Sequence, residues 1–352
     1  MKKRILLLSA LALLCIGQQA QAQEQESKAE GISDIIEYAS PSVRGMGKAR
    51  GVVIGYERLP QFDIDSKSDD PRVGNGSAHV RRNNQFFVRA LAPLMNKPQT
   101  KLILGIGYSL EEFNFSDMPP GTYPLYGYLE DKNLKSIGLQ LAYLHSIDDR
   151  RFYLIRVKGD LNGDYTHNNL NITDYLKTTI DLAYGWKKSQ DFVIGVGAQL
   201  GYTFGRKNVY PGILYNRNFN PKWGVESIFP ANARIRYNAN EKTLFYAGYR
   251  LEGASYNLYV DEPPLSQFKD LELRRTDLKG LVRVEREIYD FVWFAVEGGF
   301  RQYYRNRVFD EIGARGKDRL IDNDLAGAGY VGVELYLVPP RKWAERSNKR
   351  PQ

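Results

Sequence analysis

Short and long connections alternate along this 352-residue chain, and the segments between them have the period-two pattern of β-strands. In residues 101–111 the even positions are leucine, isoleucine or tyrosine, whereas the odd positions are mostly glycine or polar. Successive strand side chains point to opposite faces, so one face suits lipid and the other suits a packed or wet interior. The pattern recurs at 137–143, 153–158, 180–185, 194–202, 229–236, 245–252, 292–301 and 331–337, with weaker segments at 51–58, 84–92 and 278–287.

Connection length supplies the second constraint. The short connections fall at 95–99, 148–150, 187–190, 238–241 and 288–290. The long ones fall at about 60–82, 116–132, 164–173, 206–222, 258–270 and 306–324. A transmembrane barrel has short periplasmic turns and longer outer loops, whereas a soluble sandwich gives no reason for this alternation. We therefore predict an all-β fold, a transmembrane antiparallel up-and-down β-barrel of about twelve strands over residues 49–338, with both termini in the periplasm.

The two ends of the chain have their own compositions. Basic Lys2, Lys3 and Arg4 precede an apolar run over 5–16 and the small-residue pattern Ala-Gln-Ala at 20–22. This run is too short to cross a bilayer as a helix, so residues 1–22 are expected to be a cleaved signal peptide that directs export to the outer membrane. Residues 23–48 are expected to form a periplasmic lead-in or a plug in the barrel mouth, and residues 339–352 a basic periplasmic tail.

Composition excludes several classes of protein. The mean hydropathy is −0.46, and no other stretch has the long apolar run that a spanning helix needs. Hydrophobic residues at 43% and aromatic residues at 12% argue against disorder. The net charge of +8 is dispersed along the chain, which does not predict nucleic-acid binding. Cys15, the only cysteine, lies in the expected signal, so a mature chain has no disulfide, thiolate chemistry or cysteine metal site.

Three segments resemble the opening hairpins of uncharacterised Gram-negative outer-membrane β-barrel families known as domains of unknown function. They are Tyr-Glu-Arg-Leu-Pro at 56–60, Phe-Val-Arg-Ala-Leu-Ala-Pro-Leu at 87–94 and Leu-Ile-Leu-Gly-Ile-Gly-Tyr at 102–108. The similarity extends as a pattern over most of residues 50–338. Residues 329–337 also resemble the carboxy-terminal signal read by barrel-assembly machinery, which is therefore an expected partner during biogenesis. The resemblance implies a barrel fold and brings no catalytic residues.

Strand parity turns many charged residues toward the interior. The candidates for a lumen or pore lining are Arg89, Arg156, Lys158, Asp181, Arg234, Arg236, Arg250, Glu252, Arg283, Glu285, Glu297, Arg301 and Glu334. The same parity turns Glu57, Glu111, Asp160 and Glu287 inward. Two interpretations stay open: an ion-pair network that fills the lumen, or a path for polar solutes with selective charged rings. Twelve strands lie between filled barrels of about eight and open ones of about sixteen, so size does not decide between them.

Catalytic and metal chemistry have little support in the sequence. His145 and Ser146 are adjacent on one strand and so point to opposite faces, while His79 and His167 fall in predicted loops. The acidic run at 63–70 has a lysine at a ligand position and no closing glutamate, so it is interpreted as a solvated loop rather than a calcium site. We expect no cofactor, no metal and no catalytic residue.

The aromatic residues have a structural use. Trp186 and Trp293 fall near predicted periplasmic turns and Trp223 near a predicted outer loop, which indicates interfacial girdles rather than a sugar platform. Three functions remain: a narrow channel for small polar or ionic solutes, a non-transporting surface barrel that binds a partner or lipopolysaccharide through its outer loops, and a lipid-modifying membrane enzyme. Outer-membrane lipid and lipopolysaccharide are expected partners in each case, and the sequence leaves the oligomeric state open.

Overall fold

Antiparallel strands form nearly all of the computed structural model, which describes residues 38–116, 123–165, 171–260, 263–268, 271–313 and 319–339. The strands are β1 (Val52–Leu59), β2 (Phe62–Lys67), β3 (Gly76–Asn96), β4 (Thr100–Phe115), β5 (Leu134–Ser146), β6 (Arg151–Gly163), β7 (Leu176–Ser189), β8 (Phe192–Gly201), β9 (Asn208–Asn218), β10 (Trp223–Phe229), β11 (Asn232–Asn240), β12 (Thr243–Leu258), β13 (Leu271–Tyr289), β14 (Val292–Phe309), β15 (Ile321–Leu325) and β16 (Ala328–Leu337). The short helices are α2 (Pro124–Asp131), α3 (Ile172–Tyr175), η2 (Thr203–Gly205) and η3 (Leu265–Gln267).

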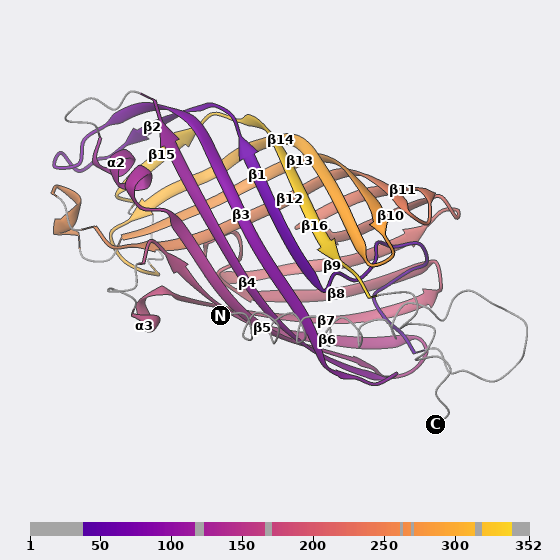
Figure 1. Ribbon diagram of the computed structural model, residues 1–352. Helices are drawn as coiled ribbons and strands as arrows, with labels where there is room; N and C mark the ends of the chain where they lie inside the picture. The colour runs from indigo at the N-terminus through magenta and orange to yellow at the C-terminus, as the bar shows by residue number, and fades with distance from the viewer. Residues whose placement is uncertain are drawn as a thin grey trace, which may run out of the picture.

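The sheet closes on itself (Figure 1). Each strand from β3 to β14 pairs with its sequence neighbours, and β1 closes the ring by pairing with both β3 and β16. Strands β1 and β2 lie end to end along β3, while β15 and β16 lie end to end along β14, so each pair makes one stave. The result is a closed antiparallel barrel of fourteen staves, which confirms the predicted fold class.

The count of fourteen differs from the predicted twelve because residues 206–222 are not a long loop. They contain β9, whose outward positions include Val209 and Ile213, and a four-residue turn at 219–222 that leads into β10. Pro211 and Gly212 in the middle of β9 favoured a loop, since proline cannot donate to a ladder and glycine weakens a strand. Strict alternation of connection length also fails here, because β10 and β11 are joined at the long-loop end by only residues 230–231.

The two ends of the barrel are unlike. At one end the strands are joined by turns at 97–99, 147–150, 190–191, 219–222, 241–242 and 290–291. All but the turn at 219–222, which lay within a predicted long connection, are close to the predicted short connections. At the other end, on the left in Figure 1, α2, α3, β2 and β15 gather in the longer connections. We call these the short-turn end and the long-loop end. The two ends of the barrel are therefore built from different kinds of connection.

The outer surface of the barrel is apolar. Large exposed hydrophobic side chains occur on successive staves at similar height, including Ile54, Ile106, Leu139, Ile155, Leu182, Val196, Ile213, Ile235, Val282, Val296 and Val333. Water-soluble monomers rarely expose so wide an apolar surface, whereas a barrel in lipid needs one and satisfies its backbone hydrogen bonds within the closed sheet. The barrel is therefore a transmembrane one. Among the described residues no helix is long and apolar enough to cross a membrane.

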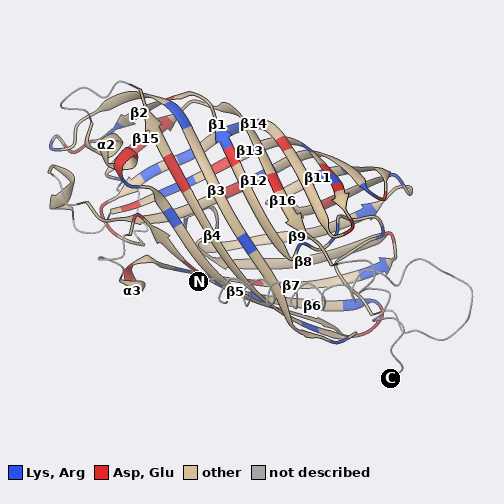
Figure 2. Ribbon diagram, viewed as in Figure 1, with Lys and Arg blue, Asp and Glu red and all other residues tan. Residues whose placement is uncertain are grey.

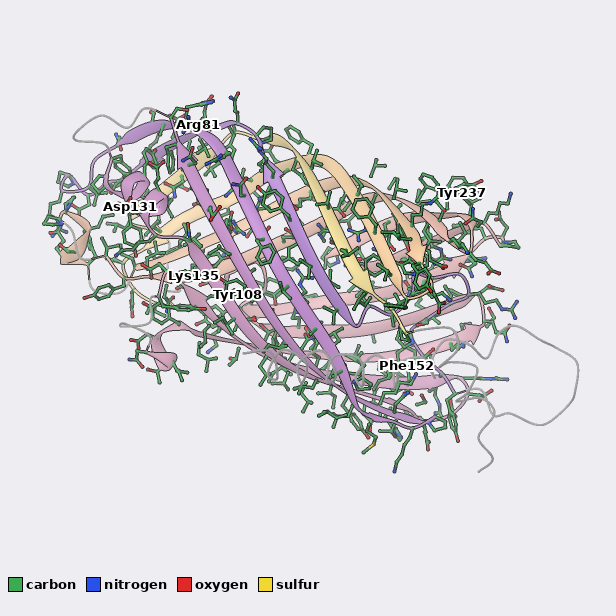
Figure 3. All side chains as sticks on the ribbon, viewed as in Figure 1. Arg81, Tyr108, Asp131, Lys135, Phe152 and Tyr237 are labelled. Carbon is green, nitrogen blue, oxygen red and sulfur yellow. The ribbon has the colours of Figure 1, made fainter. Side chains whose placement is uncertain are left out.

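Aromatic rings surround the short-turn end on the outside. Tyr184 and Trp186 have ring centroids 4.9 Å apart, and Trp223 and Tyr237 have centroids 4.7 Å apart. Figure 3 labels Tyr237 at this end and Asp131 at the opposite end. Trp223 thus lies at the short-turn end, not beside an outer loop as predicted.

Trp293 does not join this girdle. Trp293 faces the interior, is only 1% exposed and stacks on Tyr336 at 6.1 Å, so its predicted place in a girdle was wrong. Its position next to a turn suggested the interface, but its strand parity sets the inward direction. Trp343 lies outside the described residues, as do the expected signal peptide and almost all of the basic tail.

Candidate functional site: the barrel lumen

An apolar cluster packs inside the long-loop end of the barrel. This loop-end plug consists of α2 and the buried side chains around it, which include Leu59, Phe62, Ile64, Phe113, Phe115, Leu258, Leu271, Leu273, Ile321 and Leu325. Leu125 and Tyr126 of α2 are both 0% exposed. Burial of so much apolar surface makes the plug a small core of its own inside the barrel mouth.

Tyr126 is the main anchor of α2. Its hydroxyl lies 2.8 Å from Ser66 Oγ on β2 and 2.8 Å from the carbonyl oxygen of Gly76 on β3. Its ring packs against Phe115, with centroids 5.3 Å apart, and Tyr123, with centroids 5.0 Å apart. Burial raises the pKa of the Tyr126 phenol, because the charged form would lose its hydration. Helix α2 is thereby held against β2 and β3.

Below the plug, the inward faces of β1, β12, β13, β14 and β16 carry a connected set of ion pairs. We call this set the charged wall: Arg50, Glu57, Arg250, Glu252, Asp277, Lys279, Arg283, Glu285, Glu297, Arg301 and Glu334. Lys279 Nζ lies 2.7 Å from Glu57 Oε1 and 2.8 Å from Glu252 Oε2. Arg301 is 0% exposed and pairs with Asp277. Figure 2 shows acidic and basic positions interspersed on these strands.

Arg283 links the lower half of the charged wall. Its Nε lies 2.7 Å from Glu285 Oε1, its Nη1 lies 3.3 Å from Glu297 Oε2, and its Nη2 reaches Glu334. Arg50, just before β1, adds a second cation between Glu285 and Glu334. Every charge in this set therefore has an opposite partner, as charges removed from bulk water require.

The structure brings seven of the thirteen predicted lumen residues into the charged wall: Arg250, Glu252, Arg283, Glu285, Glu297, Arg301 and Glu334. Their partner Lys279 was not singled out from the sequence, although it has the same parity as Arg283 within the predicted segment 278–287. Asp277 and its neighbour Arg275 lay just outside that segment. Extending the alternation back along β13 would have found both.

Two other predicted residues pair with a side chain that the sequence analysis missed. Arg234 Nε lies 3.0 Å and Arg236 Nη1 lies 2.6 Å from the carboxylate of Glu226. Glu226 lies on β10, most of which fell outside the strands predicted from the sequence. A four-residue turn rich in Asn, Pro and Lys at 219–222 was the available signal for this strand pair.

The opposite wall of the lumen is thinly filled. Arg156 pairs with Asp181, and Lys158 pairs with Asp160 at 2.7 Å, yet the Arg156 and Lys158 side chains remain 41% and 42% exposed. Val157, between them, faces lipid, so the water that reaches its two neighbours is inside the barrel. A methyl group added at inward-facing Gly107 would meet no atom nearer than 3.8 Å. This wall therefore borders open space.

Arg89, the last predicted residue, faces the same space from β3. Its guanidinium lies 4.8 Å from the ring centre of Phe87, and no carboxylate of the described residues lies within salt-bridge distance. Its side chain is exposed although it points inward. Arg89 is thus a cation that faces the lumen and has no carboxylate of the described residues as an ion-pair partner.

Residues 38–50 cross the inside of the short-turn end. Ala39 N donates to Asp148 O at 3.0 Å, and Arg44 N donates to Gln190 O at 3.1 Å. Val43 is 6% exposed and packs in a cluster with Phe152 and Val193. This part of the predicted 23–48 segment follows the inner rim and narrows the mouth, whereas residues 23–37 lie outside the described residues.

Neither of the two described histidines, His79 and His145, pairs with Ser146. His145 Nδ1 lies 2.9 Å from Thr100 Oγ1, and its ring contacts Tyr143 and Tyr153 on the outer face. The Ser146 hydroxyl instead donates to Ala39 O at 2.7 Å on the inner face. His79 pairs with Asp63 at 2.6 Å in the long-loop region, and His167 lies outside the described residues.

The predicted acidic loop at 63–70 is largely strand β2, and it does not gather carboxylates. Asp70 binds Arg72, and the hydrogen bond from Arg72 lowers the pKa of Asp70 to about 2. In the part of the chain that the structure describes, no three histidine, cysteine, aspartate or glutamate side chains are placed to hold a metal ion.

A comparison with models of known protein families identifies the family of this chain. A family model described as "Domain of unknown function (DUF6268)" matches residues 113–316, which is more than half of the 352 residues. The chain belongs to this family. The match runs from the end of β4 to the loop after β14 and so covers most of the barrel. No protein of curated function matches the sequence.

Solved structures with a similar arrangement include outer-membrane proteins. The chain is similar to the COG4313 outer membrane channel from Pseudomonas putida F1, with 9% identity, 87% of this chain and 100% of that chain covered, and a TM-score of 0.39. It is also similar to a Pseudomonas aeruginosa FadL homologue, with 7% identity, 82% and 90% covered, and a TM-score of 0.36. It is similar as well to the P. putida toluene transporter TodX, with 10% identity, 82% of this chain and 89% of that chain covered, and a TM-score of 0.34. At identities of 7–10% and TM-scores of 0.34–0.39, these similarities carry no function over to this chain.

Proposed function

We propose that the protein is a narrow outer-membrane channel for small polar or ionic solutes whose resting state is closed at the long-loop end. The observation that carries this proposal is the exposure of Arg156 and Lys158, two inward-facing side chains of a closed barrel. A lumen filled for stability alone would bury both of them, as the charged wall buries Lys279 and Arg301. Water and ions therefore have space beside one wall.

The closed state follows from the position of the plug. Toward the long-loop end of the lumen lie the apolar side chains around α2, through which an ion would not pass without losing its hydration. Passage requires α2 to leave its seat against β2 and β3. The orientation follows from the topology: the short-turn end faces the periplasm and the long-loop end faces outward.

Cysteine labelling tests this proposal, because the only natural cysteine is Cys15 in the expected signal. In protein reconstituted in vesicles, we expect Arg156→Cys to react with a membrane-impermeant, water-soluble thiol reagent. Val157→Cys is the matched control; it is adjacent on β6 but faces lipid, so it should stay unlabelled. Planar-bilayer recordings of the same protein should show infrequent ionic openings. An unreactive Arg156→Cys together with no conductance would refute the channel.

The sealed long-loop end favours a second function, a non-transporting surface barrel that binds a partner or lipopolysaccharide through its loops. One variant distinguishes the two functions. If α2 is unseated by Tyr126→Ala and the folded barrel still passes no ions, the lumen is sealed by more than the plug and the surface function is preferred. For a lipid-modifying activity the described residues offer one hydroxyl beside a base, Thr100 Oγ1 at 2.9 Å from His145 Nδ1, but no carboxylate among the described residues orients the His145 ring as a triad requires.

A further inference from the structure

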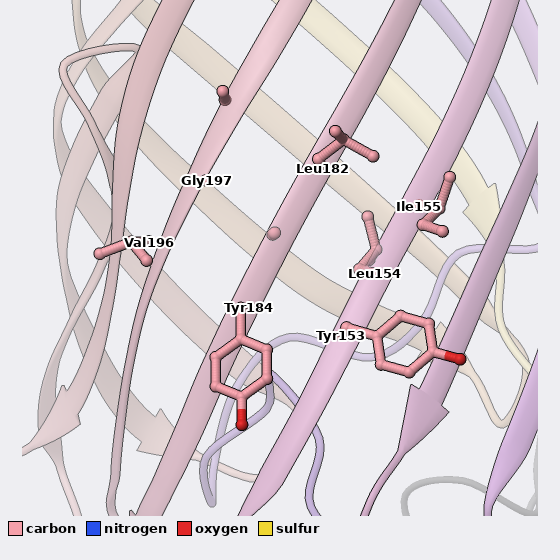
Figure 4. A pocket seen from close by; sticks show the side chains of 9 residues that line it. Tyr153, Leu154, Ile155, Leu182, Tyr184, Val196 and Gly197 are labelled. Carbon is pink, nitrogen blue, oxygen red and sulfur yellow. The ribbon is translucent and has the colours of Figure 1, made fainter.

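A shallow depression lies on the lipid-facing surface of β6, β7 and β8 (Figure 4). Its volume is about 400 Å³, and its outward-facing lining is Tyr153, Ile155, Leu182, Tyr184, Val196 and Ala198. The cause is local. Register sets Ala198 between Leu182 on β7 and Pro211 on β9, so a methyl group stands where neighbouring rows carry large side chains. The depression is apolar and open to the membrane.

A basic pocket continues the depression toward the short-turn end. It has a volume of about 520 Å³ and is lined by Asp148, Arg150, Arg151, Trp186, Lys187 and Lys188. The two are adjacent by register: Arg151 is opposite Trp186, and two residues along each strand Tyr153 is opposite Tyr184. One continuous surface thus runs from apolar side chains to aromatic rings to basic groups.

The charge of the pocket stays positive after its own ion pairs are counted. Asp148 lies 2.6 Å from Arg151, and Asp149 lies 3.6 Å from Arg150. The hydrogen bond from Arg151 lowers the pKa of Asp148, so this carboxylate is charged at neutral pH. Against these two carboxylates stand the four basic residues of the pocket. Lys188, which is exposed, adds a charge in addition to the paired arginines.

We propose that this surface binds one anionic phospholipid of the periplasmic leaflet, with its phosphate in the basic pocket and an acyl chain in the depression over Ala198. Charge complementarity selects the headgroup, since basic residues at a membrane surface attract anionic lipids. The apolar depression selects a lipid over a free phosphate. The proposal goes beyond channel activity and rests only on a membrane-spanning barrel whose short-turn end faces the periplasm.

Trp186, at the junction of the two pockets, can report occupancy. The experiment uses the full mature chain with Trp223→Phe and Trp343→Phe, in bilayers of phosphatidylcholine that contain a small fraction of brominated lipid. Brominated phosphatidylglycerol should quench the tryptophan fluorescence at lower mole fraction than brominated phosphatidylcholine. The remaining Trp293 is buried inside the barrel and away from lipid.

Two variants test the basic pocket and the apolar depression separately. Removal of two basic groups by Arg151→Gln with Lys188→Gln should weaken the relative affinity for phosphatidylglycerol about thirtyfold, roughly 2 kcal/mol at about 1.4 kcal/mol per tenfold change. Filling the depression by Ala198→Leu should lower it severalfold. The charge-matched control is Lys222→Gln with Lys242→Gln, which removes two exposed lysines from other short turns and should leave the preference unchanged.

Three results would overturn the proposal. They are equal quenching by the two brominated lipids, an equal loss of preference in the control variant, and full displacement of phosphatidylglycerol by soluble glycerol phosphate with no effect of Ala198→Leu. The last result would assign the pocket to free phosphate. None of these measurements needs ion flow, so failure of the lipid site and failure of the channel proposal are separately visible.

Discussion

The contacts that hold Tyr126 against β2 and β3 set how often the proposed channel opens. The Tyr126 hydroxyl has one proton and two acceptors at 2.8 Å, Ser66 Oγ and Gly76 O. Tyr126→Phe removes the donor and leaves a buried acceptor without it, which costs about 1–3 kcal/mol. If α2 is held in one seat and released as a unit, a cost of about 1.4 kcal/mol raises the ratio of open to closed states about tenfold.

Tyr126→Ala removes the ring as well as the hydroxyl. Truncation of a fully buried aromatic side chain costs about 3–5 kcal/mol, so the open-to-closed ratio should rise by roughly two to three and a half orders of magnitude. The ring contacts with Phe115 and Tyr123 are lost in this variant but kept in Tyr126→Phe. The series of wild type, Tyr126→Phe and Tyr126→Ala should therefore show a graded increase.

Single-channel recording in planar bilayers measures this ratio directly as the fraction of time open. Tyr56→Phe is the control, because Tyr56 is 40% exposed on the lipid face and should leave gating unchanged. A heat-dependent shift on gels verifies that each variant is a folded barrel. An unchanged open fraction in both Tyr126 variants, with folded barrels, would refute the assignment of α2 as the closing element.

Three further predictions concern the lumen. Lys279→Met should lower the free energy of unfolding by about 3–5 kcal/mol in urea titrations, because Glu57 and Glu252 both lose a partner. Adding Glu57→Leu should recover part of the loss, since Glu252 keeps Arg250; a cost of Lys279→Met below about 1 kcal/mol would contradict a structural role for these pairs. Arg89→Glu should lower the ratio of anion to cation permeability severalfold, as measured by the reversal potential in a salt gradient, and an unchanged potential would place Arg89 away from the ion path. Burial raises the pKa of Tyr123 and Tyr126, so their stabilisation of the plug is complete below the unfolded pKa of about 10 and is lost as pH rises through the folded pKa. The fraction of time open should therefore increase in alkaline buffer. An open fraction that stays constant between about pH 8 and 11 would argue against this role of the two tyrosines.

The sequence by itself determined the barrel. Period-two alternation assigns one face of each strand to lipid, and backbone groups in a membrane must be satisfied within helices or a closed sheet, so an alternating chain with short and long connections has few other solutions. The same parity turned Arg156, Arg283 and Glu297 inward. Strand β9 was missed for an equally local reason, since Pro211 and Gly212 carry the signals of a loop.

Only the tertiary structure decided which inward charges meet and where the lumen is closed. Lys279 on β13 and Glu57 on β1 are 222 residues apart in sequence. They become partners because the closed ring places β1 next to β16, β16 next to β14, and β14 next to β13. Tyr126 meets Ser66 because α2, which lies between β4 and β5 in sequence, packs against β2 in the barrel mouth. Alternation gives the face of a side chain but not its height or its neighbours across the lumen, and these depend on the register and closure of the whole sheet.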